Sequence, residues 1–188
     1  MTLWRKRAAS ASETRPGDAR LRVFEETFLP HMNAAHDLAR WLTRSDQDAQ
    51  DVVQESYLRA FRFFEGWQGG DGKAWLLTIV RNTSRSWHER RSRDADAVPF
   101  DETLHAGAAS HERSVADRLA DRDDMRVLKT CIENLPVEFR EVLVLRELEE
   151  MSYREIADAT GLAMGTVMSR LSRARRSLAE CAAGKGAR

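Results

Sequence analysis

A group of residues near the C-terminus has the types and spacing that suit contact with a nucleic acid. At 100° per residue, its hydroxyl and guanidinium side chains fall on one face of a helix. These residues, called the recognition face below, are Thr166, Ser169, Arg170, Arg173 and Arg176. Arginine offers two parallel donors to the edge of a guanine, which is a source of base specificity. A basic helix face is also commonly no more than a solvated surface, so the rest of the chain must decide between the two interpretations.

The local charge favours a polyanionic partner at this place. Residues 165–188 include six basic residues and one acidic residue, whereas the whole chain of 188 residues has no net charge. A cationic excess confined to one segment indicates the site of an electrostatic partner. The recognition face therefore predicts binding to nucleic acid.

Two short helices joined by a tight turn would present this face. Ser152 followed by Glu155 is a capping-box pattern, which predicts that a helix begins near Ser152. Gly161 stands where a left-handed residue can end that helix, because glycine lacks a Cβ. The next helix should begin at 163–165, with an apolar stripe that is separate from the recognition face. The stripe consists of Val167, Leu171, Ala174 and Leu178. This arrangement predicts a helix-turn-helix with a recognition helix.

A second basic segment lies in the N-terminal half, at residues 73–93. It has six basic residues and one acidic residue, and it follows a loop at 65–72 that contains four glycines. The outward side of a helix over this segment would present Thr78, Arg81, Asn82, Arg85 and His88. Amide, aromatic and arginine groups on a basic surface suit unstacked bases better than a duplex. We expect Trp87 to be a core residue, whereas the pattern leaves Trp75 undecided.

The remaining periodicities predict helices only, so we expect an all-α fold. The apolar residues of 19–43 fit two helices broken near Pro30, and Ser45 caps a third helix through 64. In the C-terminal half, a helix around 125–135 precedes Pro136 and a helix at 137–148. Together with the helix-turn-helix, this predicts a domain of four helices.

An acidic segment divides the chain into two small helical domains. Residues 94–124 include three basic and nine acidic residues, and the first part of the segment has no apolar period. We expect a disordered N-terminal tail, a first domain, a flexible acidic linker, a second domain and a C-terminal tail. Their predicted bounds are 1–18, 19–93, 94–114, 115–183 and 184–188.

Other features exclude several classes of protein. No window of 18 uninterrupted apolar residues could cross a bilayer, and the N-terminus lacks the apolar core of a secretory signal. Cys131 and Cys181 are isolated in the sequence, so we expect two thiols in a reducing cytoplasm rather than a disulfide or a zinc site. A metal-dependent hydrolase is a poorly supported alternative, and no metal or cofactor is expected. Its ligands would be His31, His36, Asp46, Asp48 and Asp51.

Three segments in this order resemble the bacterial extracytoplasmic-function sigma factors. They are DQDAQDVVQESYLRAF at 46–61, WLLTIVRN at 75–82, and the segment from Leu135-Pro136 to Arg176, which contains YREIADATGLAMGTVMSRLSRAR. The resemblance implies a non-enzymatic, dissociable subunit of RNA polymerase that recognises promoters in the cytoplasm. Its implied partners are core RNA polymerase, promoter DNA with minus-10 and minus-35 elements, and an anti-sigma factor. A stand-alone helix-turn-helix regulator that acts without polymerase is the alternative.

The resemblance also implies roles for individual residues. Contact with polymerase would involve Asp48, Asp51, Gln54 and Glu55. A second set, called the strand face below, would melt and hold the minus-10 strand: Trp67, Lys73, Trp75, Arg81, Asn82, Arg85 and His88. The recognition face would read the minus-35 duplex. Met168 stands where the family commonly has a basic residue and Ser172 where it often has a larger one, which predicts an unusual minus-35 preference.

Overall fold

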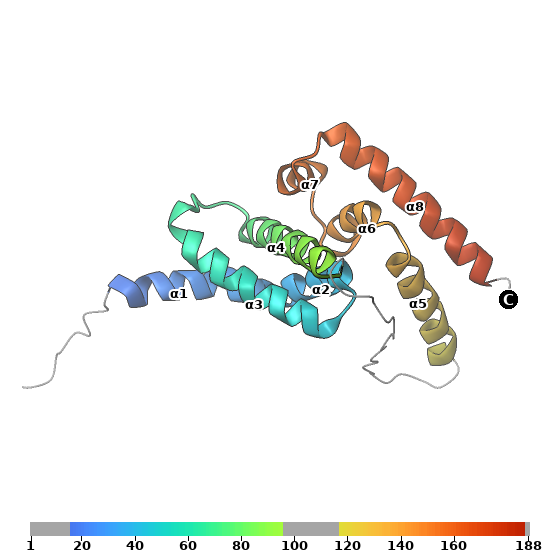
Figure 1. Cartoon of the computed structure of the whole chain (residues 1–188), viewed down its shortest axis with the longest axis horizontal. Helices are drawn as coiled ribbons and strands as arrows, with labels where there is room; N and C mark the ends of the chain where they lie inside the picture. Colours follow the sequence, from blue (N-terminus) through green and yellow to red (C-terminus); the bar gives the residue numbers. More distant parts are fainter. Residues whose placement is uncertain (1–15, 96–116, 187–188) are drawn as a thin grey trace, which may run out of the picture.

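In the computed structural model, residues 16–95 and 117–186 are described, and every regular element in these two ranges is a helix (Figure 1). This confirms the predicted all-α fold. The segments predicted as N-terminal tail and acidic linker lie almost entirely outside the described residues.

The N-terminal domain consists of four α-helices and two short 3-10 turns. Its elements are α1 (Pro16–Phe28), η1 (Leu29–His31), α2 (Met32–Thr43), α3 (Asp46–Phe63), η2 (Phe64–Gly66) and α4 (Gly72–Ala95). The predicted break at Pro30 is the turn η1, since proline cannot donate a backbone hydrogen bond inside a helix. Ser45 begins α3 as predicted, because its hydroxyl accepts a hydrogen bond from the amide of Asp48 at 3.3 Å. Helices α2, α3 and α4 pack on one another and form the centre of this domain.

The C-terminal domain consists of four α-helices and one turn of π-helix. Its elements are α5 (Asp117–Glu133), α6 (Val137–Leu143), the π turn η3 (Val144–Leu148), α7 (Tyr153–Thr160) and α8 (Met164–Gly186). The capping box at Ser152 is formed in both directions, with distances of 3.2 and 2.7 Å. Gly161 ends α7 at a φ of 69°, which is the left-handed conformation that the sequence predicts. The helix-turn-helix α7–α8 is thus confirmed.

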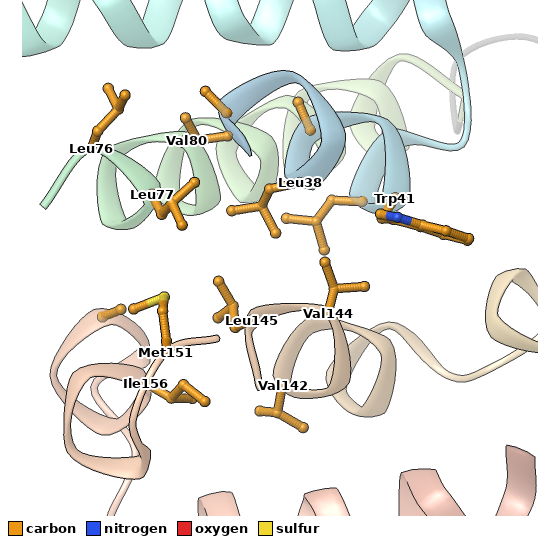
Figure 2. Close-up of a cluster of buried hydrophobic side chains, with 14 of the residues drawn as sticks. Leu38, Trp41, Leu76, Leu77, Val80, Val142, Val144, Leu145, Met151 and Ile156 are labelled. Atoms are coloured by element: carbon orange, nitrogen blue, oxygen red, sulfur yellow. The ribbon is translucent and has the colours of Figure 1, made fainter. Parts of the chain in front are cut away.

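The two domains pack directly against each other. Helix α4 lies on α7, and α2 lies on α6 and η3. Apolar side chains meet between these helices, and we call this contact the interdomain seam (Figure 2). It is formed by Leu38, Trp41 and Leu77 on one side and by Val144, Leu145 and Met151 on the other. Leu77 and Leu145 are fully buried there, and burial of such side chains stabilises the packed arrangement.

The expectation of two free thiols is wrong. Cys131 of α5 and Cys181 of α8 form a disulfide, although 50 positions separate them in the sequence. The reason is tertiary, because α5 packs on α8 and brings the two Cα atoms to 5.8 Å, a separation that a disulfide can bridge. Cys131 is buried, whereas Cys181 is half-buried. Spacing in the sequence does not carry this information.

Candidate nucleic-acid interface

Helix α8 presents the recognition face to solvent. Val167, Leu171 and Ala174 are buried and hold the opposite side of the helix in the core of the domain. Ser169, Arg173 and Arg176 are exposed, and Thr166 and Arg170 are half-buried, so the five side chains lie on the accessible side as predicted. Among the described residues, no ion pair involves Arg170, Arg173 or Arg176.

The neighbouring arginine on α8 behaves differently. Arg175 forms an ion pair with Glu147 of η3 at 2.5 Å, and hydrogen bonds to Glu147 and Tyr153 raise the pKa of its guanidinium. This exposed pair links α8 to the π turn. Met168 lies outside the recognition face as defined above and is 52% exposed on the helix. The three arginines of the recognition face therefore differ from Arg175, since no ion pair involves them among the described residues.

Two cations of the strand face form ion pairs with the C-terminal domain. The Nζ atom of Lys73 lies 3.0 Å from a carboxylate oxygen of Glu149 and donates to the backbone carbonyl of Glu149 at 2.9 Å. The guanidinium of Arg81 donates to the carboxylate of Glu141. Glu149 and Glu141 are only 6% and 9% exposed. The sequence identified both cations but gave no sign of their carboxylate partners, which lie 76 and 60 positions away.

The two tryptophans of the strand face belong to an aromatic cluster beside the glycine-rich loop. The ring of Phe28 lies 5.4 Å from that of Trp67 and 5.0 Å from that of Trp75, measured between centroids. Phe64 stacks on Trp67 at 6.0 Å. Both tryptophans remain half-buried, so each has one part in the core and one part at the surface. This places the undecided Trp75 at the edge of the core, where a ring can pack and still offer a face.

The last three residues of the strand face lie along α4. Asn82 and Arg85 are exposed. Arg85 also forms an ion pair with Glu89 one helical turn away at 3.0 Å, and such exposed pairs contribute little stability. His88 is half-buried, and its Nε2 atom is 2.8 Å from the carbonyl oxygen of Leu42. That contact attaches α4 to α2, so the imidazole has a structural bond that its predicted role did not include.

A cavity of about 490 Å³ lies between the glycine-rich loop and the C-terminal domain. One wall consists of the loop and the start of α4, including Trp67, Trp75 and Thr78. Gly69 and Gly70 have φ values of 87° and 100°, which glycine adopts readily, and they shape the loop around this space. The opposite wall is α7, with Glu155 and Asp158. The cavity therefore has an aromatic side and an acidic side.

Comparison with known proteins assigns both domains. Residues 27–94 match the sequence profile of sigma-70 region 2, and residues 125–178 match that of sigma-70 region 4. The chain is 35% identical over 138 residues to the ECF RNA polymerase sigma-E factor of Salmonella typhimurium, which covers 70% of this chain and 72% of the relative. The chain belongs to the extracytoplasmic-function family of RNA polymerase sigma factors.

Two further relatives are consistent with this assignment. The sigma factor SigE of Mycolicibacterium smegmatis is 32% identical over 157 residues, which are 82% of this chain and 60% of the relative. Among solved structures, the sigma factor RpoE in complex with the anti-sigma factor NepR from Bartonella quintana superposes with a TM-score of 0.71 at 30% identity. That superposition covers 85% of this chain and 96% of the other. The likeness thus extends across both helical domains of the sigma factor.

The four residues expected to contact polymerase lie together on α3. Asp51 and Gln54 are exposed, whereas the other two acids are paired with arginines at the end of α4. Arg91 lies 3.4 Å from Asp48, and Arg90 lies 3.1 Å from Glu55.

These arginine contacts set the acidity of Glu55 in the sigma factor. Burial opposes ionisation of this carboxyl, but hydrogen bonds from Arg90 and Arg59 outweigh burial and lower its pKa. The carboxylate form of Glu55 is therefore favoured on this face. Leu58, one turn further along α3, is 63% exposed beside these acids, and the sequence interpretation missed it. Leu58 follows Asp51 by seven positions, and this spacing places both residues on the same face of a helix, which could have been recognised in the sequence.

The structure also bears on the metal-dependent alternative. Within the two described ranges of this sigma factor, no group of three or more His, Cys, Asp or Glu side chains could hold a metal ion. No helix in the same ranges is long and apolar enough to cross a membrane. Of the candidate ligands on α3, Asp46 lies near Arg40 and Asp48 pairs with Arg91, whereas Asp51 is exposed.

Proposed function

We propose that this sigma factor directs core RNA polymerase to promoters by gripping the minus-35 duplex with α8 and opening the minus-10 region with α4 and the glycine-rich loop. One observation carries the proposal: a single chain combines an exposed basic recognition helix with a second basic helix beside half-buried tryptophans. The first suits a duplex groove and the second suits unstacked bases. Every step uses binding energy, so the protein acts as a non-enzymatic initiation factor without a cofactor.

The recognition face would read the minus-35 element in the major groove. Ser169, Arg170 and Arg173 form the middle of the recognition face on α8 and are assigned to bases and phosphates. Thr166 and Arg176 flank them and are assigned to the backbone. The exposed Met168 would add an apolar contact where a cation is common in the family. This change supports a minus-35 preference that differs from that of typical members.

The strand face would hold the minus-10 strand. Trp67 and Trp75 line the cavity and would offer ring faces to flipped bases. Lys73, Arg81 and Arg85 would neutralise phosphates, because cations along a helix can follow a single strand. Asn82 is exposed next to Arg81 and is assigned to a base edge, and His88 is assigned to positioning α4 through Leu42.

The acidic side of α3 would dock on core polymerase. Asp48, Asp51, Gln54 and Glu55 form this surface, and its position away from the recognition face lets one chain bind polymerase and the duplex together. The paired arginines of α4 support the arrangement, since they hold two of the acids in place. The resulting complex would act in the cytoplasm.

An anti-sigma protein is the proposed regulatory partner. The solved relative RpoE was crystallised with the anti-sigma factor NepR, and it matches this chain over 85% of its length. Co-expression of a tagged chain with its neighbouring genes should recover a stoichiometric inhibitor that lowers transcription. Repeated recovery of polymerase alone would remove support for this partner.

The decisive experiment is transcription in vitro with purified core polymerase on a library of promoter sequences. We expect the full chain to start transcripts from a subset of the library with shared minus-35 and minus-10 elements. A pull-down with core polymerase separates this function from a stand-alone regulator. Duplex binding without a polymerase complex and without transcripts would favour the regulator and contradict the proposal.

A further inference from the structure

We propose that the N-terminal segment Trp4-Arg5-Lys6-Arg7 docks in the cavity between the glycine-rich loop and α7, where its cations meet the acidic wall and its indole meets the tryptophans. The cavity would thus be an interaction site for a basic peptide, and the peptide would come from the same chain. This contact requires neither DNA nor polymerase, so it is independent of the proposed function.

The carboxylates of the cavity lack cationic partners. Asp71, Glu155 and Asp158 line it, together with no lysine, arginine or histidine of the described residues. Asp71 accepts a hydrogen bond from the backbone amide of Ala74 at 3.1 Å, and Glu155 accepts one from that of Ser152 at 2.7 Å. Asp158 is exposed, and no hydrogen bond or ion pair involves its side chain within the described ranges. Since a cleft lined by charges of one sign attracts counter-ions, this cavity favours a cation.

Two carboxylates next to the cavity are already neutralised by other parts of the chain. Glu65 precedes the lining residue Gly66 and lies 2.6 Å from the guanidinium of Arg20. Glu149 lies 3.0 Å from the Nζ atom of Lys73. The nearby cations are thus bound to these two glutamates, and the carboxylates of the cavity remain available to a cation from another segment.

The aromatic wall of the cavity suits the same ligand. Trp67 and Trp75 are half-buried, and their ring centroids lie 6.5 Å apart. A guanidinium is attracted to the face of an indole, which is the best aromatic acceptor for a cation. This protein contains such a contact elsewhere, since the guanidinium of Arg40 lies 5.2 Å from the ring centroid of Trp41. Trp4 would add an aromatic pair with the wall.

Charge and length select the N-terminal segment as the occupant. Three segments lie outside the described residues, at 1–15, 96–116 and 187–188. Residues 1–15 include four basic residues and one acidic residue, whereas 96–116 include one basic and four acidic residues. The two residues at 187–188 follow the far end of α8, about 34 Å from the start of this 23-residue helix. The N-terminal segment therefore combines the positive charge with the length that docking requires.

The start of α1 brings this segment within reach of the cavity. Helix α1 begins at Pro16, and Arg20 of its second turn contacts Glu65 beside the lining residue Gly66. Trp4 precedes Pro16 by 12 positions, and an extended chain of that length spans about 40 Å. A short tether gives the segment an effective concentration on the order of millimolar. Docking therefore needs only a modest intrinsic affinity.

Photo-cross-linking of the full chain, without DNA or polymerase, tests the contact. The probe is p-benzoylphenylalanine in place of Trp4, which reacts with neighbouring C–H bonds, and mass spectrometry locates the products. We expect cross-links within one chain to residues 66–78 and 155–159. Salt at about 1 M should lower their yield about threefold, because screening weakens attraction to the acidic wall. Cross-links only to other residues, cross-links only between two copies, or none at all would overturn the inference.

A matched pair of variants connects the contact to the acidic wall. Asp158→Asn removes the unpaired carboxylate, and the control Asp37→Asn makes the same change at an exposed residue of α2. We expect the cross-link yield to fall about threefold in D158N and to stay unchanged in D37N, as for the loss of one partly exposed ion pair. Thermal unfolding should be the same in both, which excludes a folding artefact. Equal yields would show that the segment does not bind this wall.

A second pair of variants tests the cations of the segment. R5Q/K6Q/R7Q should lower the yield about tenfold, because three attractions are lost together. Its control loses two arginines and one lysine at exposed positions outside the cavity lining, as R22Q/R93Q/K129Q. An equal fall in the control would indicate a general charge effect and contradict docking. Transcription in vitro reports the proposed function separately, so the failure of one can be told from the failure of the other.

Discussion

Helices α4 and α8 have the same kind of basic face but differ in what covers it. On α8, Arg173 and Arg176 are exposed and no ion pair involves them among the described residues. On α4, Lys73 and Arg81 are bound to carboxylates of the other domain. This difference shows that the charge pattern of the sequence indicates the chemistry of a surface. Whether the cations of that surface are accessible to a ligand depends on packing between the domains. The predictions below test each side of this contrast.

The disulfide gives the largest expected effect, and it concerns only the domain with the open surface. Replacing Cys181 with Ser should lower the free energy of unfolding by about 2–4 kcal/mol, since a cross-link over a long loop restricts the unfolded chain. Thermal unfolding monitored by circular dichroism measures this loss. C131S should give the same loss, and a reductant should destabilise the wild-type chain but leave C131S/C181S unaffected. Insensitivity of the wild-type chain to the reductant would show that the disulfide contributes nothing.

The next effect tests the open surface directly. Arg173→Glu should weaken binding of a minus-35 duplex by about 1–3 kcal/mol, roughly fivefold to 150-fold, because an exposed cation at a groove is replaced by an anion. Fluorescence anisotropy with a duplex selected from the promoter library measures it. The matched control is Arg22→Glu, which makes the same charge change at an exposed position of α1. An equal loss in both variants would indicate a general charge effect rather than a recognition face.

A smaller effect compares two cations of the strand face, Arg85, which pairs within α4, and Lys73, which pairs with the other domain. In the free chain, Arg85→Gln should weaken single-strand binding about threefold. The steepness with which the logarithm of the affinity falls with the logarithm of the salt concentration should drop by about one, as expected for one lost phosphate contact. Lys73→Gln should leave this binding nearly unchanged, because Glu149 already occupies the lysine. Salt titrations of oligonucleotide affinity distinguish the two variants. The contrast between the two surfaces breaks down if Lys73→Gln costs as much as Arg85→Gln.

A further effect, on stability rather than on binding, concerns support for the aromatic wall. The hydroxyl of Tyr57 donates to the backbone carbonyl of Phe28 at 2.8 Å, and Phe28 packs on Trp67 and Trp75. Tyr57→Phe should lower the free energy of unfolding by about 1 kcal/mol through loss of this hydrogen bond. Chemical denaturation at neutral pH measures the change.

The stabilising contribution of Tyr57 should fall at alkaline pH. Burial raises the pKa of Tyr57 to about 12 from the ordinary value of 10.0. A raised folded-state pKa means that the stabilising contribution is complete below pH 10.0 and is lost as the pH rises toward 12. The stability difference between the wild-type chain and Tyr57→Phe should therefore shrink over this window. A constant difference would show that the phenol is not buried in solution.

Local signals in the sequence predict most helix ends and the accessible side of α8. Ser45, Ser152 and Gly161 act through backbone groups within four positions, so their effect can be foreseen from neighbouring residues. The apolar stripe at Val167 and Leu171 likewise identifies the buried side of α8. These features need no knowledge of the other domain.

Contacts between distant segments could not be foreseen in the same way. The carboxylate partners of Lys73 and Arg81, the disulfide of Cys131 and the bond from His88 to Leu42 all join segments at least 46 positions apart. Each of them depends on how whole helices pack, and the periodicity of a single helix does not indicate which other helix it will contact. The sequence therefore indicates which side chains form the candidate surfaces but not which of them are occupied.

The interdomain seam has a consequence for the behaviour of the protein at high concentration. Separation of the domains would transfer the apolar sides of Leu77, Leu145 and Met151 to water. Newly exposed apolar patches promote self-association, and the tendency grows with protein concentration. The separated form should therefore precipitate or oligomerise unless polymerase or DNA binds it promptly. Light scattering would make this colloidal difference visible between E141Q/E149Q, which loses the ion pairs between the domains, and E138Q/E180Q, which loses two exposed carboxylates.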